Sequence, residues 1–84
     1  MSNPSVQKLS DLPIGATAVV HSLQSGLPSL TRLREFGLLP GVKVQLIRKA
    51  PLGDPMEISV RGSMLSVRRT EAEAIEVTVT EETK

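Results

Sequence analysis

Apolar and polar residues alternate in short runs along this chain, at residues 17–23, 42–47, 56–61, 64–69 and 75–80. A period of two over so few residues is typical of strands that bury one face and expose the other. The inward positions of these runs are aliphatic, as with Val44 and Leu46 in the second run. The alternation therefore predicts a mainly β protein of about five strands.

The hydrophobic period changes between the first two runs, where apolar residues recur every three positions at Leu27, Leu30, Leu33 and Phe36. This spacing predicts a short helix over residues 28–36 whose apolar face packs on the core. Pro28 is tolerated in a first turn, and Gly37 suits the residue just after a helix. The other face carries Thr31, Arg32, Arg34 and Glu35.

Three further segments have the residue types of turns. Residues 8–15 place Leu9, Leu12 and Ile14 at spacings that suit one turn of 3₁₀ helix, which would place these apolar groups on the end of the core. Gly62 and Ser63 favour a tight reversal between the third and fourth runs. Thr70, three residues before Glu73, has the spacing of a capping box and predicts one helical turn before the last run.

The 84 residues suffice for one small core. Closure into a barrel leaves few exposed strand edges, so we predict a small SH3-like barrel with the helix between strands one and two. The predicted domain spans residues 8–79, between a flexible N-terminus at 1–7 and a solvated tail at 80–84.

Composition excludes several functions. Ten Lys and Arg residues balance nine Asp and Glu residues, so the net charge of +1 does not indicate a nucleic-acid or membrane partner. The single aromatic residue, Phe36, cannot supply a groove for proline-rich peptides or a surface that stacks bases. Without cysteine, the chain has neither a disulfide nor a thiolate metal ligand.

No arrangement of reactive residues indicates catalysis. His21 is the only histidine and is read as a surface or core residue, and the adjacent Ser22 points to the opposite face of its strand. The carboxylates lack the spacing of metal ligands, and no phosphate-binding loop is present. We predict no catalytic residue, cofactor or dedicated metal site. Without a signal peptide or an apolar membrane span, a cytoplasmic protein is expected.

The basic residues of the predicted strands admit two interpretations. They are Lys43, Arg48, Lys49, Arg61, Arg68 and Arg69. The favoured interpretation is a solvated outer face, which is ordinary for a small domain. The alternative is a binding patch for phosphate or an acidic protein. A second function, as a small-barrel nucleic-acid-binding module that uses strand arginines, would use the same residues.

The stretch APLGDP at residues 50–55 predicts a stiff loop. Ala50 to Gly53 suit a type I turn with Pro51 in its second position, and Asp54 is restricted by the following proline. Such a loop presents Leu52 at a low entropic cost if a partner receives it. Leu52 could equally fold back and plug the end of the barrel, and the sequence leaves both interpretations open.

The segment RLREFGLLPGVKVQLIRK, the loop APLGDP and the segment MEISVRGSMLSVRRTEAEAIEV together resemble the FeoA family over residues 8–79. That family consists of small cytosolic proteins of bacterial ferrous iron uptake. The resemblance implies an SH3-like barrel with a helical insertion. It also implies a non-enzymatic accessory protein that binds the cytoplasmic part of FeoB, the membrane iron transporter with a G-protein domain.

The resemblance places the family motif on the helix, its exit and the loop. The predicted partner-binding residues are Arg32, Arg34, Leu38, Leu39, Leu52 and Asp54. An arginine of the helix could also act as an arginine finger on a GTPase, although a helix arginine is usually only solubilising. Exposed leucines at 38, 39 and 52 could also support a homo-oligomer.

Overall fold

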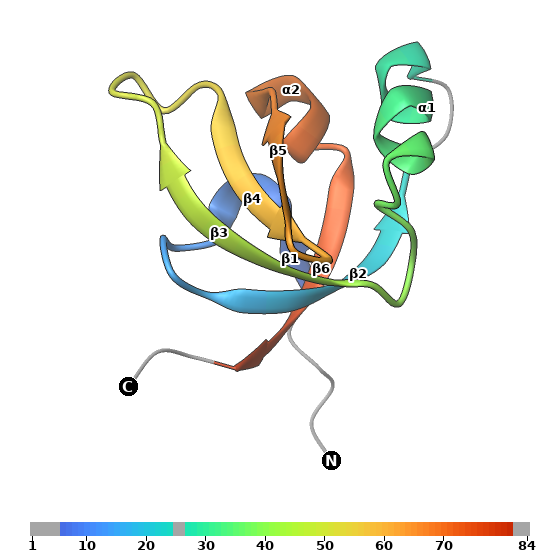
Figure 1. Ribbon diagram of the computed structural model, residues 1–84, viewed down its shortest axis with the longest axis horizontal. Coiled ribbons are helices and arrows are strands. Elements are labelled where there is room, and N and C mark those ends of the chain that lie inside the picture. Colours follow the sequence, from blue (N-terminus) through green and yellow to red (C-terminus); the bar gives the residue numbers. More distant parts are fainter. Residues whose placement is uncertain (1–5, 25–26, 82–84) are drawn as a thin grey trace.

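The computed structural model describes residues 6–24 and 27–81. They form one six-stranded antiparallel sheet with the strand order β1-β6-β2-β3-β4-β5, which curls into a barrel (Figure 1). The elements are β1 (Val6–Lys8), the 3₁₀ helix η1 (Leu9–Asp11), β2 (Thr17–Leu23), α1 (Pro28–Glu35), β3 (Lys43–Lys49), β4 (Met56–Val60), β5 (Ser63–Val67), α2 (Arg69–Ala72) and β6 (Ile75–Glu81). The predicted mainly β barrel with a helix between its first two long strands is confirmed.

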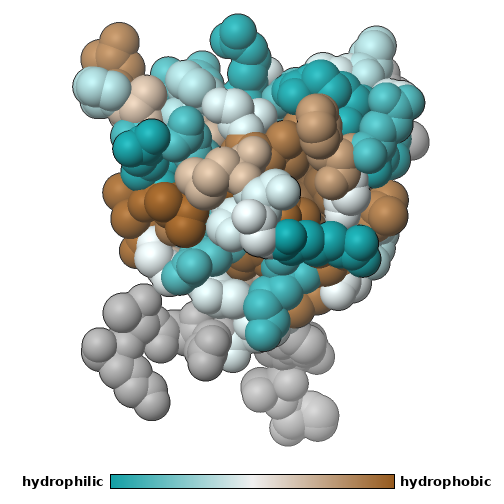
Figure 2. All heavy atoms as spheres, viewed as in Figure 1, coloured by the Kyte–Doolittle hydropathy of each residue, from teal (hydrophilic) through white to brown (hydrophobic). Residues whose placement is uncertain are grey.

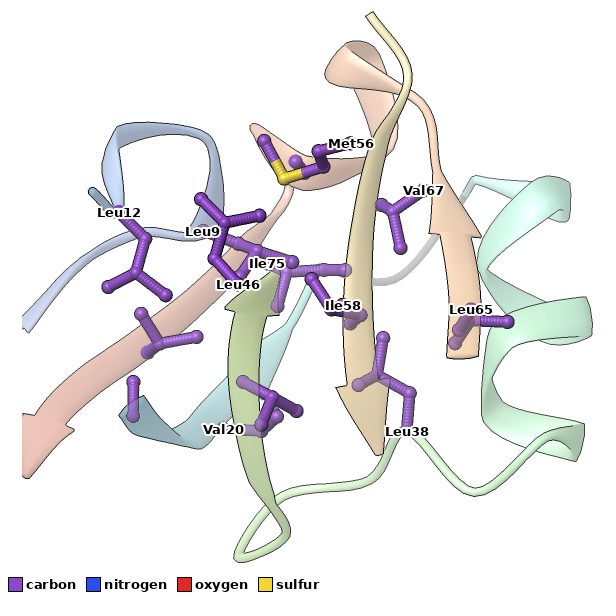
Figure 3. Close-up of a cluster of buried hydrophobic side chains, with 14 of the residues drawn as sticks. Leu9, Leu12, Val20, Leu38, Leu46, Met56, Ile58, Leu65, Val67 and Ile75 are labelled. Carbon is purple, nitrogen blue, oxygen red and sulfur yellow. The ribbon is translucent and has the colours of Figure 1, made fainter. Parts of the chain in front are cut away.

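The inward sides of the strands meet in one aliphatic core. Figure 3 shows side chains from β2, β3, β4, β5 and β6 pointing toward one another, with Leu9 and Leu12 among them. The expectation that Ile14 packs beside them is wrong, because it lies beyond the 3₁₀ helix, which ends at Asp11, and is 61% exposed. Met56, Ile58 and Val60 of β4 are all buried, as the alternation predicts. Burial of these aliphatic side chains is the main favourable contribution to the stability of the barrel.

The sixth strand, β1, was not expected from the sequence. It includes residues 6 and 7, which were assigned to a flexible N-terminus, and it pairs with β6 through Val6 and Thr78, Gln7 and Val77, and Lys8 and Glu76. Three residues are too few to show a hydrophobic period. The pairing comes from backbone hydrogen bonds to a strand that is distant in sequence.

Helix α1 buries only the middle of its predicted apolar face. Leu30 and Leu33 are fully buried, whereas Leu27 and Phe36 are exposed. Residues three apart are offset by about 60° around an α-helix, because the helix has about 3.6 residues per turn. A face centred between Leu30 and Leu33 therefore leaves Leu27 and Phe36 about 90° away on either side. The expectation that all four apolar residues of this face pack on the core is therefore wrong for Leu27 and Phe36.

Two local predictions are displaced by one or two residues. The reversal between β4 and β5 uses Arg61 and Gly62, both at positive φ, rather than Gly62 and Ser63, because Val60 pairs with Ser63 across the turn. At α2, the Glu71 carboxylate accepts a hydrogen bond from the Arg68 backbone N–H at 2.9 Å. The helix therefore begins two residues earlier than the capping box predicted at Thr70 and Glu73.

Candidate partner-binding surface

The loop between β3 and β4 is closed by hydrogen bonds at its base and inside its turn. The Ala50 N–H donates to the Pro55 carbonyl at 2.9 Å, and the Gly53 N–H donates to the Ala50 carbonyl at 2.7 Å. Gly53 has φ +86, a conformation that L side chains rarely adopt, so glycine suits this corner. Prolines at 51 and 55 restrict the remaining backbone, and the Asp54–Pro55 peptide bond is cis. The predicted turn at residues 50–53 is confirmed.

Leu52 stands at the tip of this loop and is 90% exposed. It therefore does not plug the barrel, and the structure excludes one of the two interpretations left open by the sequence. Met56, Leu9 and Leu12 belong to the buried core instead. In Figure 2, apolar spheres project at the upper left, where Figure 1 shows the tip of this loop.

Asp54 joins the loop to α2. Its Oδ1 accepts a hydrogen bond from the Arg69 backbone N–H at 3.0 Å, at the first residue of that helix. This N–H has no partner within the helix, because the first N–H groups of any helix lack an intrahelical acceptor. Asp54 therefore restrains the loop, and it is also exposed to solvent.

Arg32 joins α1 to the same short helix. Its Nη2 lies 3.7 Å from Glu71 Oε1, and the Arg32 side chain is 50% exposed while that of Glu71 is 6% exposed. Glu71 also holds the start of α2 through its bond with Arg68. The arginine is thus partly engaged within the molecule, and its other face is open to solvent.

The remaining predicted contact residues lie at the end of α1 or just after it. Arg34 is half-buried and Leu39 is exposed. Leu38 is fully buried and is labelled within the core in Figure 3, so its prediction as an exposed contact residue is wrong. Its N–H donates to the Leu33 carbonyl at 3.0 Å, so the chain folds back over the helix end and carries Leu38 inward.

Phe36 is an exposed apolar residue that its helical spacing does not predict. It is 64% exposed and stands three residues before Leu39, on the same helix exit. Its exposure could have been predicted from the helical geometry described above. Residues three apart are offset by about 60°, so the last of four residues spaced in this way leaves the buried face of the helix. An exposed aromatic side chain next to an exposed leucine is typical of an interaction surface.

These residues form a surface that we call the rim: the loop 50–55, α2, and α1 with its exit to Leu39, which runs down from α1 toward the start of β3 (Figure 1). Figure 1 shows α2 between the loop and α1 along the upper side of the barrel. The rim brings the predicted residues together in two groups, with Leu52 and Asp54 at one end and Arg32, Arg34 and Leu39 at the other. Each group is joined to α2 by one polar contact.

The basic residues of the strands do not form an uninterrupted positive surface. Arg48 Nε lies 2.6 Å from Glu57 Oε1, and Arg69 Nε lies 3.7 Å from Glu73 Oε2. These ion pairs favour the interpretation of a solvated outer face over that of a continuous positive surface that binds nucleic acid. The absence of a nucleic-acid partner stays a prediction.

The described residues do not assemble a reactive centre. Among residues 6–24 and 27–81, no three His, Asp or Glu side chains are grouped so that they could hold a metal ion. Ser22 Oγ donates to Glu76 Oε1 at 3.1 Å, on a strand where the neighbouring His21 is exposed. Within the same described ranges, no helix has both the length and the apolar character needed to cross a membrane.

A family model described as the FeoA domain matches residues 7–79, which is most of the chain. The chain belongs to the FeoA family. This family is associated with ferrous iron transport. The resemblance seen in the sequence motifs is therefore confirmed, and the rim is part of an FeoA domain.

Solved FeoA structures share the whole architecture. The FeoA protein of Chlorobium tepidum is 40% identical, with a TM-score of 0.82 over 93% of this chain and 74% of that chain. FeoA of Stenotrophomonas maltophilia, solved with zinc and described as a prokaryotic SH3 domain protein, is 33% identical, with a TM-score of 0.74 over 84% of this chain and 88% of that chain. An FeoA-like protein of Clostridium acetobutylicum is 26% identical, with a TM-score of 0.86 over 99% of this chain and 95% of that chain. The zinc belongs to the Stenotrophomonas protein, and for this chain the lack of a dedicated metal site stays a prediction.

Proposed function

We propose that this protein is a non-enzymatic accessory protein of ferrous iron uptake that binds the cytoplasmic part of the FeoB transporter through its rim. The iron-transport context comes from the FeoA family. The Stenotrophomonas relative is described as a candidate activating factor for ferrous iron transport, which supports the same kind of role here. This proposal requires a contact surface on the protein and a location in the cytoplasm.

The observation that carries this proposal is the exposure of Leu52 on a restrained loop. A leucine that is 90% exposed stabilises nothing within the barrel, so burying it in a partner's pocket is a net gain of apolar burial. The loop is held by its own turn and by Asp54, so little conformational entropy is lost when a partner receives it. A stiff loop with an apolar tip can anchor an interface by filling a pocket on the partner.

The second group of rim residues extends the proposed contact. Phe36 and Leu39 add apolar surface at the α1 exit, and Arg34 and the open face of Arg32 add positive charge beside it. Aromatic residues and arginine are enriched at interface hot spots, while the surrounding polar residues exclude water. Binding in this arrangement acts through shape and needs no reactive group. A homo-oligomer built on the same leucines stays a separate prediction.

The test is a binding titration between the full chain and the cytoplasmic domain of FeoB. Replacing Leu52 by Glu is expected to weaken binding by about 30-fold, because a buried charge replaces an apolar anchor worth about 2 kcal/mol. The stability of the variant should be unchanged, since Leu52 makes no core contact. Circular dichroism and thermal unfolding check the fold of each variant.

Ile14→Glu is the matched control, because Ile14 is 61% exposed and lies outside the rim. This variant makes the same change of charge at another exposed aliphatic side chain and is expected to bind as the wild type does. If Leu52→Glu binds normally, the loop is not the interface. If both variants lose binding equally, the effect is one of charge rather than of the rim.

A further inference from the structure

We propose that a hollow on the outer face of β2, β3 and β4 binds an acidic segment of a partner protein. The hollow has a volume of about 490 Å³. Its lining includes the polar residues Lys43, Arg61, Thr17, Gln45 and Ser59, together with Gly41, Val42 and Val44 at and before the start of β3. Thr17 pairs with Gln45, and Gln45 pairs with Ser59, so the polar side chains form a row across three strands. None of the described residues that line it is acidic.

The two cations of the hollow are unpaired in the described structure. Across residues 6–24 and 27–81, the ion pairs of arginine involve positions 32, 48 and 69, and neither Lys43 nor Arg61 belongs to one. Lys43 precedes Val44 in β3 and Arg61 follows Val60 in the turn after β4, and Val44 pairs with Val60. Both cations line the same hollow, so their like charges repel each other unless an anion lies between them.

Arg61 also adopts an unfavourable backbone conformation. It has φ +53 at the first central position of the turn between β4 and β5, where Asn, Asp and Gly are preferred. Gly62 occupies the second central position at φ +83 and has no such cost. An arginine here thus opposes stability through both charge and backbone. Local costs of this kind concentrate at functional sites.

The chemistry of the hollow fits carboxylates better than nucleic acid. The guanidinium of Arg61 can bind a carboxylate with two parallel hydrogen bonds, and the Lys43 ammonium adds a point charge beside it. The hydroxyls of Thr17 and Ser59 offer further donors along the row. Nucleic acid instead needs a longer line of cations and aromatic rings for stacking, and no aromatic residue lines this hollow.

The hollow lies far from the loop end of the rim and close to its other end. Lys43 begins β3 and the loop 50–55 follows its end, so the hollow and the loop lie at opposite ends of that strand (Figure 1), whereas Gly41 in the lining follows Leu39 of the α1 exit by two residues. Seven residues of strand span about 20 Å. One partner could therefore hold the rim while an acidic segment occupies the hollow. This inference does not depend on the identity of the partner at the rim.

The experiment titrates the full ¹⁵N-labelled chain with a capped peptide of alternating Asp and Glu, and follows backbone amide shifts by NMR. We expect saturable shifts at residues 41–45 and 59–62, which weaken as salt rises. The matched peptide with Asn and Gln in place of the acids should cause none. A single-stranded DNA oligonucleotide that binds these residues more tightly than the acidic peptide would overturn the proposal, as would the absence of shifts with the peptide.

Arg61→Asn is the decisive variant. Asn tolerates positive φ, so the melting temperature should be equal or higher, while affinity for the acidic peptide falls about fivefold. Arg68→Gln removes the same charge at the other end of β5 and should change affinity by less than about twofold. Equal losses in both variants would show a net-charge effect and overturn the site. Lys43→Gln provides a second variant within the hollow, and unchanged affinity in it and in Arg61→Asn would also overturn the proposal.

Discussion

The loop APLGDP and the helix exit FGLLPG have similar compositions, since both place leucine among proline and glycine. In the loop, Leu52 is almost fully exposed, whereas at the exit Leu38 is buried and the adjacent Leu39 is exposed. Proline and glycine determine the backbone path in both segments. They do not determine which side chain is buried. That depends on whether the core has space for a side chain beneath that part of the backbone.

The largest expected effect separates the two adjacent leucines of the exit. Leu38→Ala should lower the free energy of unfolding by about 2–5 kcal/mol, because it leaves a cavity in a close-packed core. Leu39→Ala should lower it by no more than about 0.5 kcal/mol, since an exposed side chain has few neighbours. Chemical denaturation of both variants measures the difference.

Equal destabilisation by the two substitutions would contradict this view of the exit. Leu52→Ala extends the comparison to the loop. Its free energy of unfolding should be close to that of Leu39→Ala, because both side chains are exposed. For binding to the FeoB domain, Leu52→Ala is expected to cost more than Leu39→Ala. A leucine at the tip of a restrained loop can enter a pocket more deeply than one beside a helix.

The parts of the fold that the sequence predicts are those governed by short-range rules. Strand β2 has the predicted bounds, α1 begins at Pro28, and the turn at 50–53 forms as its residue types require. Each depends on alternation, on proline or on glycine within a few residues. The same rules fail for β1, whose three residues form a strand only because β6 lies beside them.

The sequence identified the segments that carry the candidate residues, although their role in binding stays a prediction. Leu52 and Asp54 of the loop and Arg32 and Arg34 of the helix lie on the rim, whereas Leu38 lies beneath it in the core. Tertiary packing determines whether single side chains are buried or exposed, as with Leu38 and Phe36. A hydrogen bond between residues distant in sequence positions Asp54 against Arg69. Neither kind of contact leaves a local signal in the sequence.

The next prediction concerns the hydrogen bond that joins the loop to α2. Asp54→Ala should lower the free energy of unfolding by about 0.5–1.5 kcal/mol, because the Arg69 N–H loses its acceptor. It should also weaken FeoB binding, but less than Leu52→Glu does, since the leucine remains on a looser loop. Hydrogen exchange at the Arg69 amide reports the broken bond directly.

Asp54→Asn serves as the control for this bond. The asparagine side-chain oxygen can still accept from the Arg69 N–H, so exchange at that amide and the stability should stay near the wild-type values. If Asp54→Asn weakens FeoB binding as strongly as Asp54→Ala does, the carboxylate contacts the partner itself. Its role would then extend beyond positioning Leu52.

The smallest expected effect concerns the ion pair that joins α1 to α2. A double-mutant cycle with Arg32→Ala and Glu71→Ala should give a coupling energy of about 0.5 kcal/mol, because the arginine is half exposed and water can replace it. The coupling should shrink as salt is added, since the pair is screened. The Asp54 hydrogen bond, with a neutral backbone donor, should respond less.

The two contacts thus differ in physical kind although both end on the same short helix. If high salt loosened the loop as much as α1, measured by hydrogen exchange, the distinction between a backbone hydrogen bond and an exposed ion pair would be wrong. If only α1 loosens, the loop is the rigid end of the rim and the helix exit the adaptable one. A partner that requires both ends would then lose affinity with salt through Arg32, while its contact with Leu52 persisted.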